Sequence, residues 1–99
     1  MSEWEIRFHP ELIKDLDALG SKELEIFYKK KEKIRQNPLR MEHLSGGANC
    51  YREPITENIR LIYYIEGKTI WLLTVGKHNQ AYKVYVKRLH SLRERLQAN

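Results

Sequence analysis

The feature that most constrains the fold is a pair of apolar segments joined by a short turn. Residues 59–65 read Ile-Arg-Leu-Ile-Tyr-Tyr-Ile, residues 69–75 read Thr-Ile-Trp-Leu-Leu-Thr-Val, and Glu66-Gly67-Lys68 separates them. Runs rich in β-branched and aromatic residues on either side of a short glycine-containing turn are typical of a β-hairpin. The sequence therefore predicts two neighbouring antiparallel strands here.

Successive side chains of a strand point to opposite faces, so the alternation assigns these residues to the faces of a sheet. One face of the first strand carries Ile59, Leu61, Tyr63 and Ile65, and the other carries Arg60, Ile62 and Tyr64. In the second strand, Trp71, Leu73 and Val75 oppose Ile70, Leu72 and Thr74. If helices cover one face, the face that carries Arg60 is at least partly open, and we expect the chemistry there.

The N-terminal third of the chain predicts a strand and two helices. Residues 3–8 alternate polar and apolar side chains, as a half-buried strand does. Apolar residues then recur at helical spacing from Leu12 to Leu19, and Gly20 interrupts them. Ser21 is suited to be the N-cap of a second helix that stops near Asn37-Pro38. The two helices predict an antiparallel helical hairpin.

The remaining elements complete an α+β pattern. Residues 41–49 predict a loop centred on Ser45-Gly46-Gly47, and residues 50–53 predict a short strand whose edge or end is Pro54. A terminal helix is expected from about Gln80. This order implies one domain over residues 1–99, in which the N-terminal strand and helical hairpin pack on an antiparallel sheet and a C-terminal helix follows.

Composition narrows the class of protein. No apolar run approaches the roughly 20 residues of a membrane helix, and the acidic N-terminus does not resemble a secretion signal, so we expect a cytoplasmic domain. The single cysteine, Cys50, excludes a disulfide within the chain and a cysteine-based zinc site, and it is more often a small hydrophobe than a nucleophile. The histidines, at positions 9, 43, 78 and 90, lack metal-ligand spacing. We expect no metal and no cofactor.

The charge favours a polyanionic partner. Eighteen Lys and Arg against 13 Asp and Glu give a net charge of +5, and neutralising phosphates releases counterions. Two basic stripes are present. One is formed by Lys29, Lys30, Lys31, Lys33 and Arg35, and the other by Lys83, Lys87, Arg88, Arg93 and Arg95. They are either solvated helix faces or contacts to phosphates, and we expect Lys29, Lys30, Lys31, Lys33, Lys77 and Lys83 to contact RNA or the ribosome.

Residues 76–82, Gly-Lys-His-Asn-Gln-Ala-Tyr, are the strongest candidate for chemistry. They follow a predicted strand and precede a predicted helix, and such loops often carry function. His78 and Tyr82 offer an imidazole and a phenol, and Arg52 and Arg60 on neighbouring strands offer fixed cations. This set suits RNA cleavage through the substrate's own 2′-hydroxyl, which needs a base, an acid and cations around the phosphate. The alternative is that His78 is a solvated turn residue and Tyr82 a core aromatic.

A family resemblance extends over nearly the whole chain. Its motifs are Leu44-Ser45-Gly46, Cys50-Tyr51-Arg52, Arg60-Leu61-Ile62-Tyr63, Val75-Gly76-Lys77-His78, Tyr82 and Lys87-Arg88. Together they resemble the RelE/ParE superfamily of bacterial type II toxins. The resemblance implies a small α+β toxin in a hetero-oligomer with a cognate antitoxin that wraps it. In the RelE-like branch, the toxin enters the ribosomal A site and cuts mRNA there during translation.

The resemblance also assigns roles to single residues. Arg60 matches the strand arginine that binds the scissile phosphate, and Tyr82 matches the aromatic near the start of the terminal helix. Arg52 replaces a strand lysine, whereas Pro54 stands where RelE has a second lysine that is thought to help as base. His78 falls where several relatives use a catalytic histidine. We therefore expect His78 to transfer the proton, as acid or as base, because an imidazole titrates near neutrality.

Three functions follow from these observations. The leading hypothesis is a metal-independent, ribosome-dependent mRNA endonuclease with Arg52, Arg60, His78 and Tyr82 as its catalytic residues. The alternative is a ParE-like inhibitor of DNA gyrase that shares the fold without nuclease activity, since fold alone does not decide function. A third is a basic RNA-binding module without catalysis, which would bind RNA in a salt-sensitive way.

Overall fold

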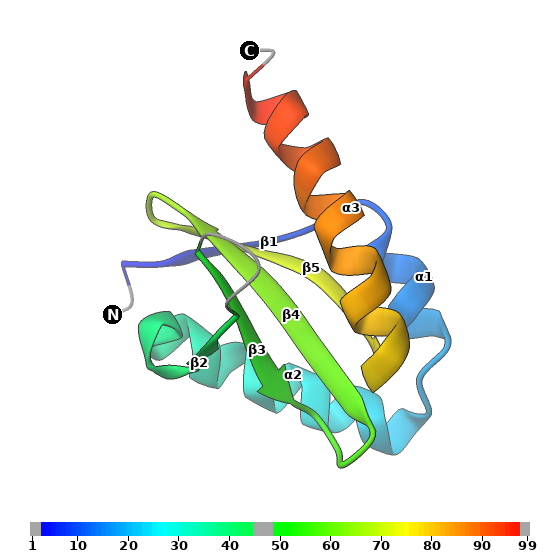
Figure 1. Cartoon of the computed structure of the whole chain (residues 1–99). Helices are drawn as coiled ribbons and strands as arrows, with labels where there is room; N and C mark the ends of the chain where they lie inside the picture. The colour runs from blue at the N-terminus through cyan, green and yellow to red at the C-terminus, as the bar shows by residue number, and fades with distance from the viewer. Residues whose placement is uncertain (1–2, 45–48, 98–99) are drawn as a thin grey trace.

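The computed structural model describes residues 3–44 and 49–97 and has the predicted α+β architecture (Figure 1). Along the chain the elements are β1 (Glu5–Phe8), α1 (Leu12–Asp17), α2 (Ser21–Gln36), the 3₁₀ turn η1 (Pro38–Arg40), β2 (Glu42–His43), β3 (Cys50–Pro54), β4 (Ile59–Glu66), β5 (Thr69–Lys77) and α3 (His78–Gln97). The predicted loop centre at Ser45-Gly46-Gly47 lies outside the described residues.

The strands form a mixed sheet in the order β1-β5-β4-β3-β2. The pairs β3–β4 and β4–β5 are antiparallel, as predicted, and β2 also pairs antiparallel with β3. β1, in contrast, lies parallel to β5, with Glu5 opposite Thr69 and Phe8 opposite Leu72. A parallel pair needs a long connection, and α1, α2 and the antiparallel strands provide it between β1 and β5. The N-terminal strand therefore forms one edge of the sheet next to the predicted hairpin.

The predicted hairpin of residues 59–75 is confirmed, and its ladder continues to Lys77. Its turn places Gly67 at a φ of +59°, a left-handed conformation that side chains with a Cβ rarely adopt. The two strands pair from Ile59 opposite Lys77 to Glu66 opposite Thr69. The hairpin thus extends directly to the residue that precedes α3.

Helices cover both faces of the sheet (Figure 1). α1 and α2 pack on the face that carries Ile59, Leu61, Tyr63 and Ile65, together with Leu12, Leu16, Phe27 and Ile34. α3 packs on the other face, where its Ala81, Tyr85, Leu89 and Leu92 contact a cluster that contains Cys50, Ile62, Tyr64 and Leu73. Both predicted faces of β4 are confirmed. The face that carries Arg60 is covered in part by α3, and Arg60 itself is half-buried.

A β-bulge in β5 corrects the predicted faces of that strand. Ile62 lies opposite Thr74 and Tyr63 lies opposite Leu72, so Leu73 is an extra residue in the ladder. The extra residue shifts the alternation that follows it. Val75 therefore packs with the α1–α2 cluster, whereas Leu73 packs with the α3 cluster, and the prediction that both share a face was wrong.

Three predicted boundaries also need correction. The N-cap of α2 is Gly20 rather than Ser21, and the Glu23 carboxylate accepts a hydrogen bond from the Gly20 amide at 2.9 Å. The short strand β2 lies inside the predicted loop of residues 41–49. β5 ends at Lys77 and α3 begins at His78, so no loop separates them.

In the described part of the chain, every helix is too short or too polar to span a bilayer.

Candidate functional site

The junction of β5 and α3 holds His78 against the β3–β4 turn. His78 is the first residue of α3, and its amide donates a hydrogen bond of 2.9 Å to the carbonyl of Asn58. Its side chain is exposed. The backbone of His78 is therefore held between the end of a strand and the start of a helix, whereas the sequence predicted a loop here.

Tyr82 lies one helical turn after His78, on the same side of α3. The centroids of the two rings are 4.8 Å apart and the rings are nearly perpendicular, at 88°. This edge-to-face arrangement is favourable for aromatic pairs. The spacing of four residues brings the two rings together because it corresponds to about one turn of an α-helix.

Arg52 joins this pair from β3. Its guanidinium donates a hydrogen bond to the Tyr82 hydroxyl and lies 5.8 Å from the centroid of the Tyr82 ring. Arg52 and Tyr82 are both half-buried. The structure thus brings three of the four predicted catalytic residues together in one cluster, which we call the Arg52–Tyr82–His78 cluster.

Arg60, the fourth predicted residue, is held at the same turn as His78. Its guanidinium donates to the carbonyls of Thr56 at 2.8 Å and Glu57 at 3.0 Å, which lie next to Asn58. On β4, Arg60 lies opposite Gly76 of β5, where an added Cβ would meet no atom within 4 Å. The space beside Gly76, opposite Arg60, is therefore open.

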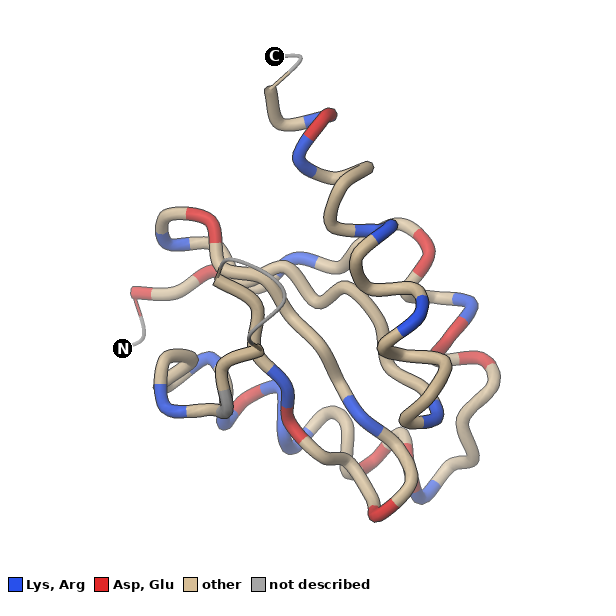
Figure 2. The backbone as a smooth tube through the Cα atoms, viewed as in Figure 1, with Lys and Arg blue, Asp and Glu red and all other residues tan. Residues whose placement is uncertain are grey.

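The predicted RNA-contacting lysines fall on two sides of the molecule. Lys77 and Lys83 are exposed near the start of α3. The lysines of α2 lie behind the sheet, as the blue segments there show (Figure 2). Lys30 pairs with the buried carboxylate of Glu53 at 3.0 Å, and Lys29 pairs with Glu25 at 3.6 Å. The remaining two are Lys31, which lies over the Phe8 and Tyr28 rings, and the exposed Lys33.

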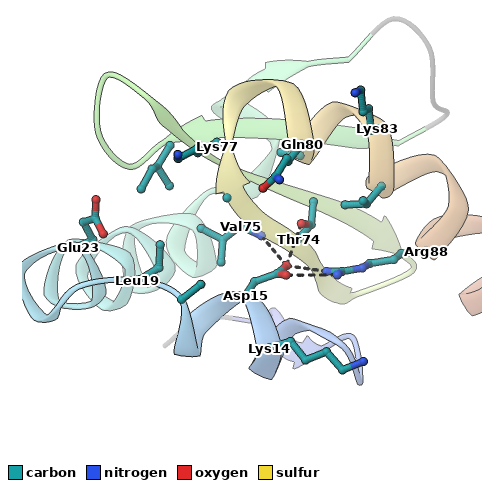
Figure 3. A pocket seen from close by; sticks show the side chains of 15 residues that line it. Lys14, Asp15, Leu19, Glu23, Thr74, Val75, Lys77, Gln80, Lys83 and Arg88 are labelled. Atoms are coloured by element: carbon teal, nitrogen blue, oxygen red, sulfur yellow. Dashed lines mark hydrogen bonds and ion pairs between the residues drawn. The ribbon is translucent and has the colours of Figure 1, made fainter.

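A separate cleft of about 680 Å³ lies between α1, the end of β5 and the first turns of α3 (Figure 3). Lys77, Gln80 and Lys83 stand along its rim, and an ion pair between Asp15 and Arg88 lies at its base. The sequence gives no signal for Asp15, whereas Arg88 belongs to a basic stripe and to the Lys87-Arg88 motif. No local signal pairs them, because 73 residues separate them along the chain.

Cys50 takes no part in this site. It is fully buried in the α3 cluster, and burial raises the pKa of its thiol to about 11. A thiol that stays protonated at neutral pH is a poor nucleophile. This agrees with the expectation that Cys50 is a small hydrophobe.

Among residues 3–44 and 49–97, no three His, Cys, Asp or Glu side chains are grouped so that they could hold a metal ion.

Solved structures share this fold. A double mutant of the Escherichia coli toxin RelE in its free state is 26% identical, with a TM-score of 0.76 over 89% of this chain and 98% of that one. The RelE of a RelE–RelB complex from Pyrococcus horikoshii is 20% identical, with a TM-score of 0.64 over 76% of this chain and 94% of that one. The YoeB dimer from Staphylococcus aureus is 17% identical, with a TM-score of 0.65 over 78% of this chain and 99% of that one.

No protein-family model matches the chain, and no curated protein matches it. The two structures below 25% identity show the fold alone. The similarity to the Escherichia coli toxin covers almost the full length of both chains, and it agrees with the motifs in the sequence. The fold is therefore that of RelE/ParE-superfamily toxins, as the motifs in the sequence predicted.

Proposed function

We propose that this protein is the toxin of a type II toxin–antitoxin system and cuts mRNA in the ribosomal A site during translation. The observation that carries the proposal is the Arg52–Tyr82–His78 cluster beside Arg60. A purely structural role does not require a guanidinium, a phenol and an exposed imidazole on one surface. RNA cleavage through the 2′-hydroxyl uses all three kinds of group.

The reaction proceeds by attack of the 2′-oxygen on the adjacent phosphorus. A bond forms between the 2′-oxygen and phosphorus while the bond from phosphorus to the 5′-oxygen breaks, which leaves a 2′,3′-cyclic phosphate and a 5′-hydroxyl. One proton leaves the 2′-hydroxyl, and one proton must reach the 5′-oxygen. The exposed imidazole of His78 transfers one of these protons.

The two arginines have separate tasks in this reaction. Arg60 stabilises the charge on the phosphate, because its guanidinium is already fixed by carbonyls of the β3–β4 turn next to open space. Arg52 adds positive charge and holds the Tyr82 hydroxyl. Tyr82 then stacks on a base or orients the 2′-hydroxyl, as aromatic side chains do with splayed RNA bases.

The partners follow from the same proposal. Solved relatives include RelE–RelB and YoeB–YefM complexes, so we propose a cognate antitoxin for this chain as well. A toxin that acts on translating ribosomes works in the cytoplasm. The exposed Lys29, Lys33, Lys77 and Lys83 provide contacts to RNA phosphates that carry no sequence preference.

A cell-free translation reaction tests the proposal. The protein is added to a translated mRNA, and primer extension maps the 5′ ends, with a ribosome-free reaction run alongside. We expect new ends within codons only when ribosomes are present. His78→Ala should abolish them, whereas His90→Ala should not, because His90 is an exposed histidine of α3 that pairs with Glu94.

Intact mRNA in the wild-type reaction would refute the nuclease, whereas the same ends with His78→Ala would refute only the proton-transfer role of His78. A supercoiling assay with gyrase on the same preparation then tests the alternative. Arg60→Lys is preferable to Arg60→Ala for the phosphate role, because the guanidinium also holds two carbonyls of the turn. Thermal melting of each variant separates lost chemistry from lost folding.

A further inference from the structure

Asp15 and Arg88 form the most connected polar group in the described chain outside the candidate site (Figure 3). The carboxylate of Asp15 accepts from both terminal nitrogens of Arg88, at 2.6 and 3.2 Å. It also accepts from the Thr74 hydroxyl at 2.8 Å and from the Val75 amide at 3.1 Å. One carboxylate therefore ties α1 to β5 and α3 at once.

The bulged edge of β5 explains why a charged pair stands here. β1 ends at Phe8, opposite Leu72, so within the described residues no strand pairs with this edge of β5 beyond Leu72. The Val75 amide donates to Asp15 instead, and the Leu73 carbonyl accepts from Arg88 at 2.9 Å. Partly buried backbone groups without a partner would be costly, and the ion pair supplies both partners. The side chains of Arg88 and Asp15 are only 12% and 17% exposed.

Arg88 and Tyr82 fix α3 from two different sides. In an α-helix, residues six apart lie about 240° apart around the axis and about 9 Å apart along it. Arg88 is bonded to α1 and β5, and Tyr82 accepts a hydrogen bond from Arg52 on β3. Two anchors on different sides of one helix determine its rotation about its own axis. That rotation decides where the rings of His78 and Tyr82 lie over the sheet.

We infer that Asp15 and Arg88 are positioning residues for the Arg52–Tyr82–His78 cluster. They hold the first half of α3 so that the Tyr82 hydroxyl meets Arg52 and the His78 imidazole lies beside the Tyr82 ring. The expected loss of cleavage rests on the proposed nuclease function, whereas the placement of the Tyr82 hydroxyl and the His78 imidazole does not. A displacement of about 1 Å in a reacting group lowers a rate by about 100-fold, so loss of this anchor should reduce cleavage.

The test uses fluorine NMR of the full chain labelled with 3-fluorotyrosine. The Tyr82 resonance is assigned by its loss in Tyr82→Phe. Asp15→Asn keeps the shape of the side chain but removes its charge, and Arg88→Lys keeps the charge but removes the two-nitrogen contact. We expect both variants to move the Tyr82 resonance toward that of free 3-fluorotyrosine. The two substitutions alter the same ion pair from α1 and from α3. If one variant fails to fold, the other still tests the inference.

Matched controls separate positioning from general destabilisation. Asp17→Asn removes an exposed carboxylate from the end of the same helix, and Ile34→Val removes one buried methyl group from the α2 core. Neither should move the Tyr82 resonance. The inference is overturned if Asp15→Asn and Arg88→Lys leave this resonance in place, or if Ile34→Val moves it as far.

A kinetic arm completes the test. In the translation assay, Asp15→Asn should lower kcat by about 10- to 100-fold while KM stays within about twofold, because reacting groups are misplaced and ribosome contacts are kept. A change in KM alone would contradict the inference. The NMR arm needs no substrate, so its result stands whether or not the protein cuts mRNA.

Discussion

At the scale of single residues, the most informative contact is the hydrogen bond from Arg52 to the Tyr82 hydroxyl. Removing the hydroxyl with Tyr82→Phe keeps the ring beside His78 but frees it from Arg52. We expect a loss of about 10- to 100-fold in cleavage rate, since small misplacements of reacting groups are costly. Unfolding free energy should change by less than about 1 kcal/mol, because the pair is only half-buried. Single-turnover kinetics and urea titration measure the two effects.

Tyr28→Phe is the matched control, because Tyr28 is an exposed tyrosine of α2 on the other side of the sheet. Its cleavage rate should equal that of the wild type. If Tyr82→Phe also retained the full rate, the hydroxyl would have no part in the reaction.

A second tyrosine, Tyr63, holds the core together. The Tyr63 hydroxyl, in the core beneath α2, donates to the carbonyl of Pro38 at 2.7 Å. Tyr63→Phe should reduce the unfolding free energy by about 1–2 kcal/mol, because a buried carbonyl is left without its donor. Urea denaturation measures this loss. No loss of stability would mean that the carbonyl finds another partner.

At the scale of elements, the hairpin turn depends on one glycine. Gly67 has a φ of +59°, so Gly67→Ala should cost about 1 kcal/mol although no atom lies within 4 Å of the new methyl group. Gly76→Ala is the comparison, because Gly76 also has open space but no positive φ. It should leave the melting temperature unchanged or raise it. Equal losses in the two variants would show that the turn conformation is not the cause.

The stability of the fold should depend on pH through His9, which precedes α1. His9 is buried, its Nδ1 accepts from the Glu11 amide, and burial together with the Arg88 charge lowers the pKa of its imidazole. The unfolded state then binds a proton more readily than the folded state. Stability is therefore complete above the ordinary histidine pKa of about 6.5, and it falls as the pH drops through that value.

His9→Asn tests this effect, because an asparagine oxygen can replace Nδ1 as the acceptor but does not titrate. Urea denaturation from about pH 8 to about pH 5 should show a steeper loss of stability in the wild type than in the variant. Parallel curves would show that His9 is not responsible for the pH dependence.

Local sequence patterns predicted most of the elements, and the errors came from long-range contacts. The alternation of residues 59–65 identified both faces of β4 correctly. The same reasoning failed in β5, because the bulge at Leu73 arises from pairing with β4 and leaves no mark in the sequence. The pairing of Asp15 with Arg88 was not predicted for a similar reason, since only the fold brings the two residues together. The parallel pairing of β1 likewise depends on the complete topology.

The candidate site was predicted in its residue types but not in its geometry. Arg52, His78 and Tyr82 were named from their places in the sequence, and the structure brings them into contact. That His78 begins a helix directly after β5 was not foreseen, since a loop was expected there. Contacts between side chains on β3 and α3 depend on how α3 packs on the sheet, which no local pattern encodes.

At the scale of the whole molecule, the net charge of +5 is spread over two sides of the sheet (Figure 2). If the exposed lysines of α2 contact ribosomal RNA, then Lys29→Gln with Lys33→Gln should weaken ribosome binding without slowing cleavage at saturation. The slope of log Kd against log salt concentration should fall by about 2, one for each lost phosphate contact. Salt-dependent binding to purified ribosomes measures it.

Lys68→Gln is the control for this charge change. Lys68 is exposed in the β4–β5 turn and pairs with Glu3. For Lys68→Gln, the slope of log Kd for ribosome binding against log salt concentration should match that of the wild type. If all lysine variants weakened binding alike, total charge rather than the α2 surface would govern association.

The central claim is that this protein cuts mRNA by attack of the substrate's 2′-hydroxyl, with the Arg52–Tyr82–His78 cluster beside Arg60. The most direct measurement uses ribosomes programmed with an mRNA that carries a single 2′-deoxynucleotide on the 5′ side of the mapped cleavage position. We predict cleavage of the all-ribose mRNA, with a 2′,3′-cyclic phosphate product, and no cleavage at the substituted position. Equal cleavage of the two mRNAs would contradict the account.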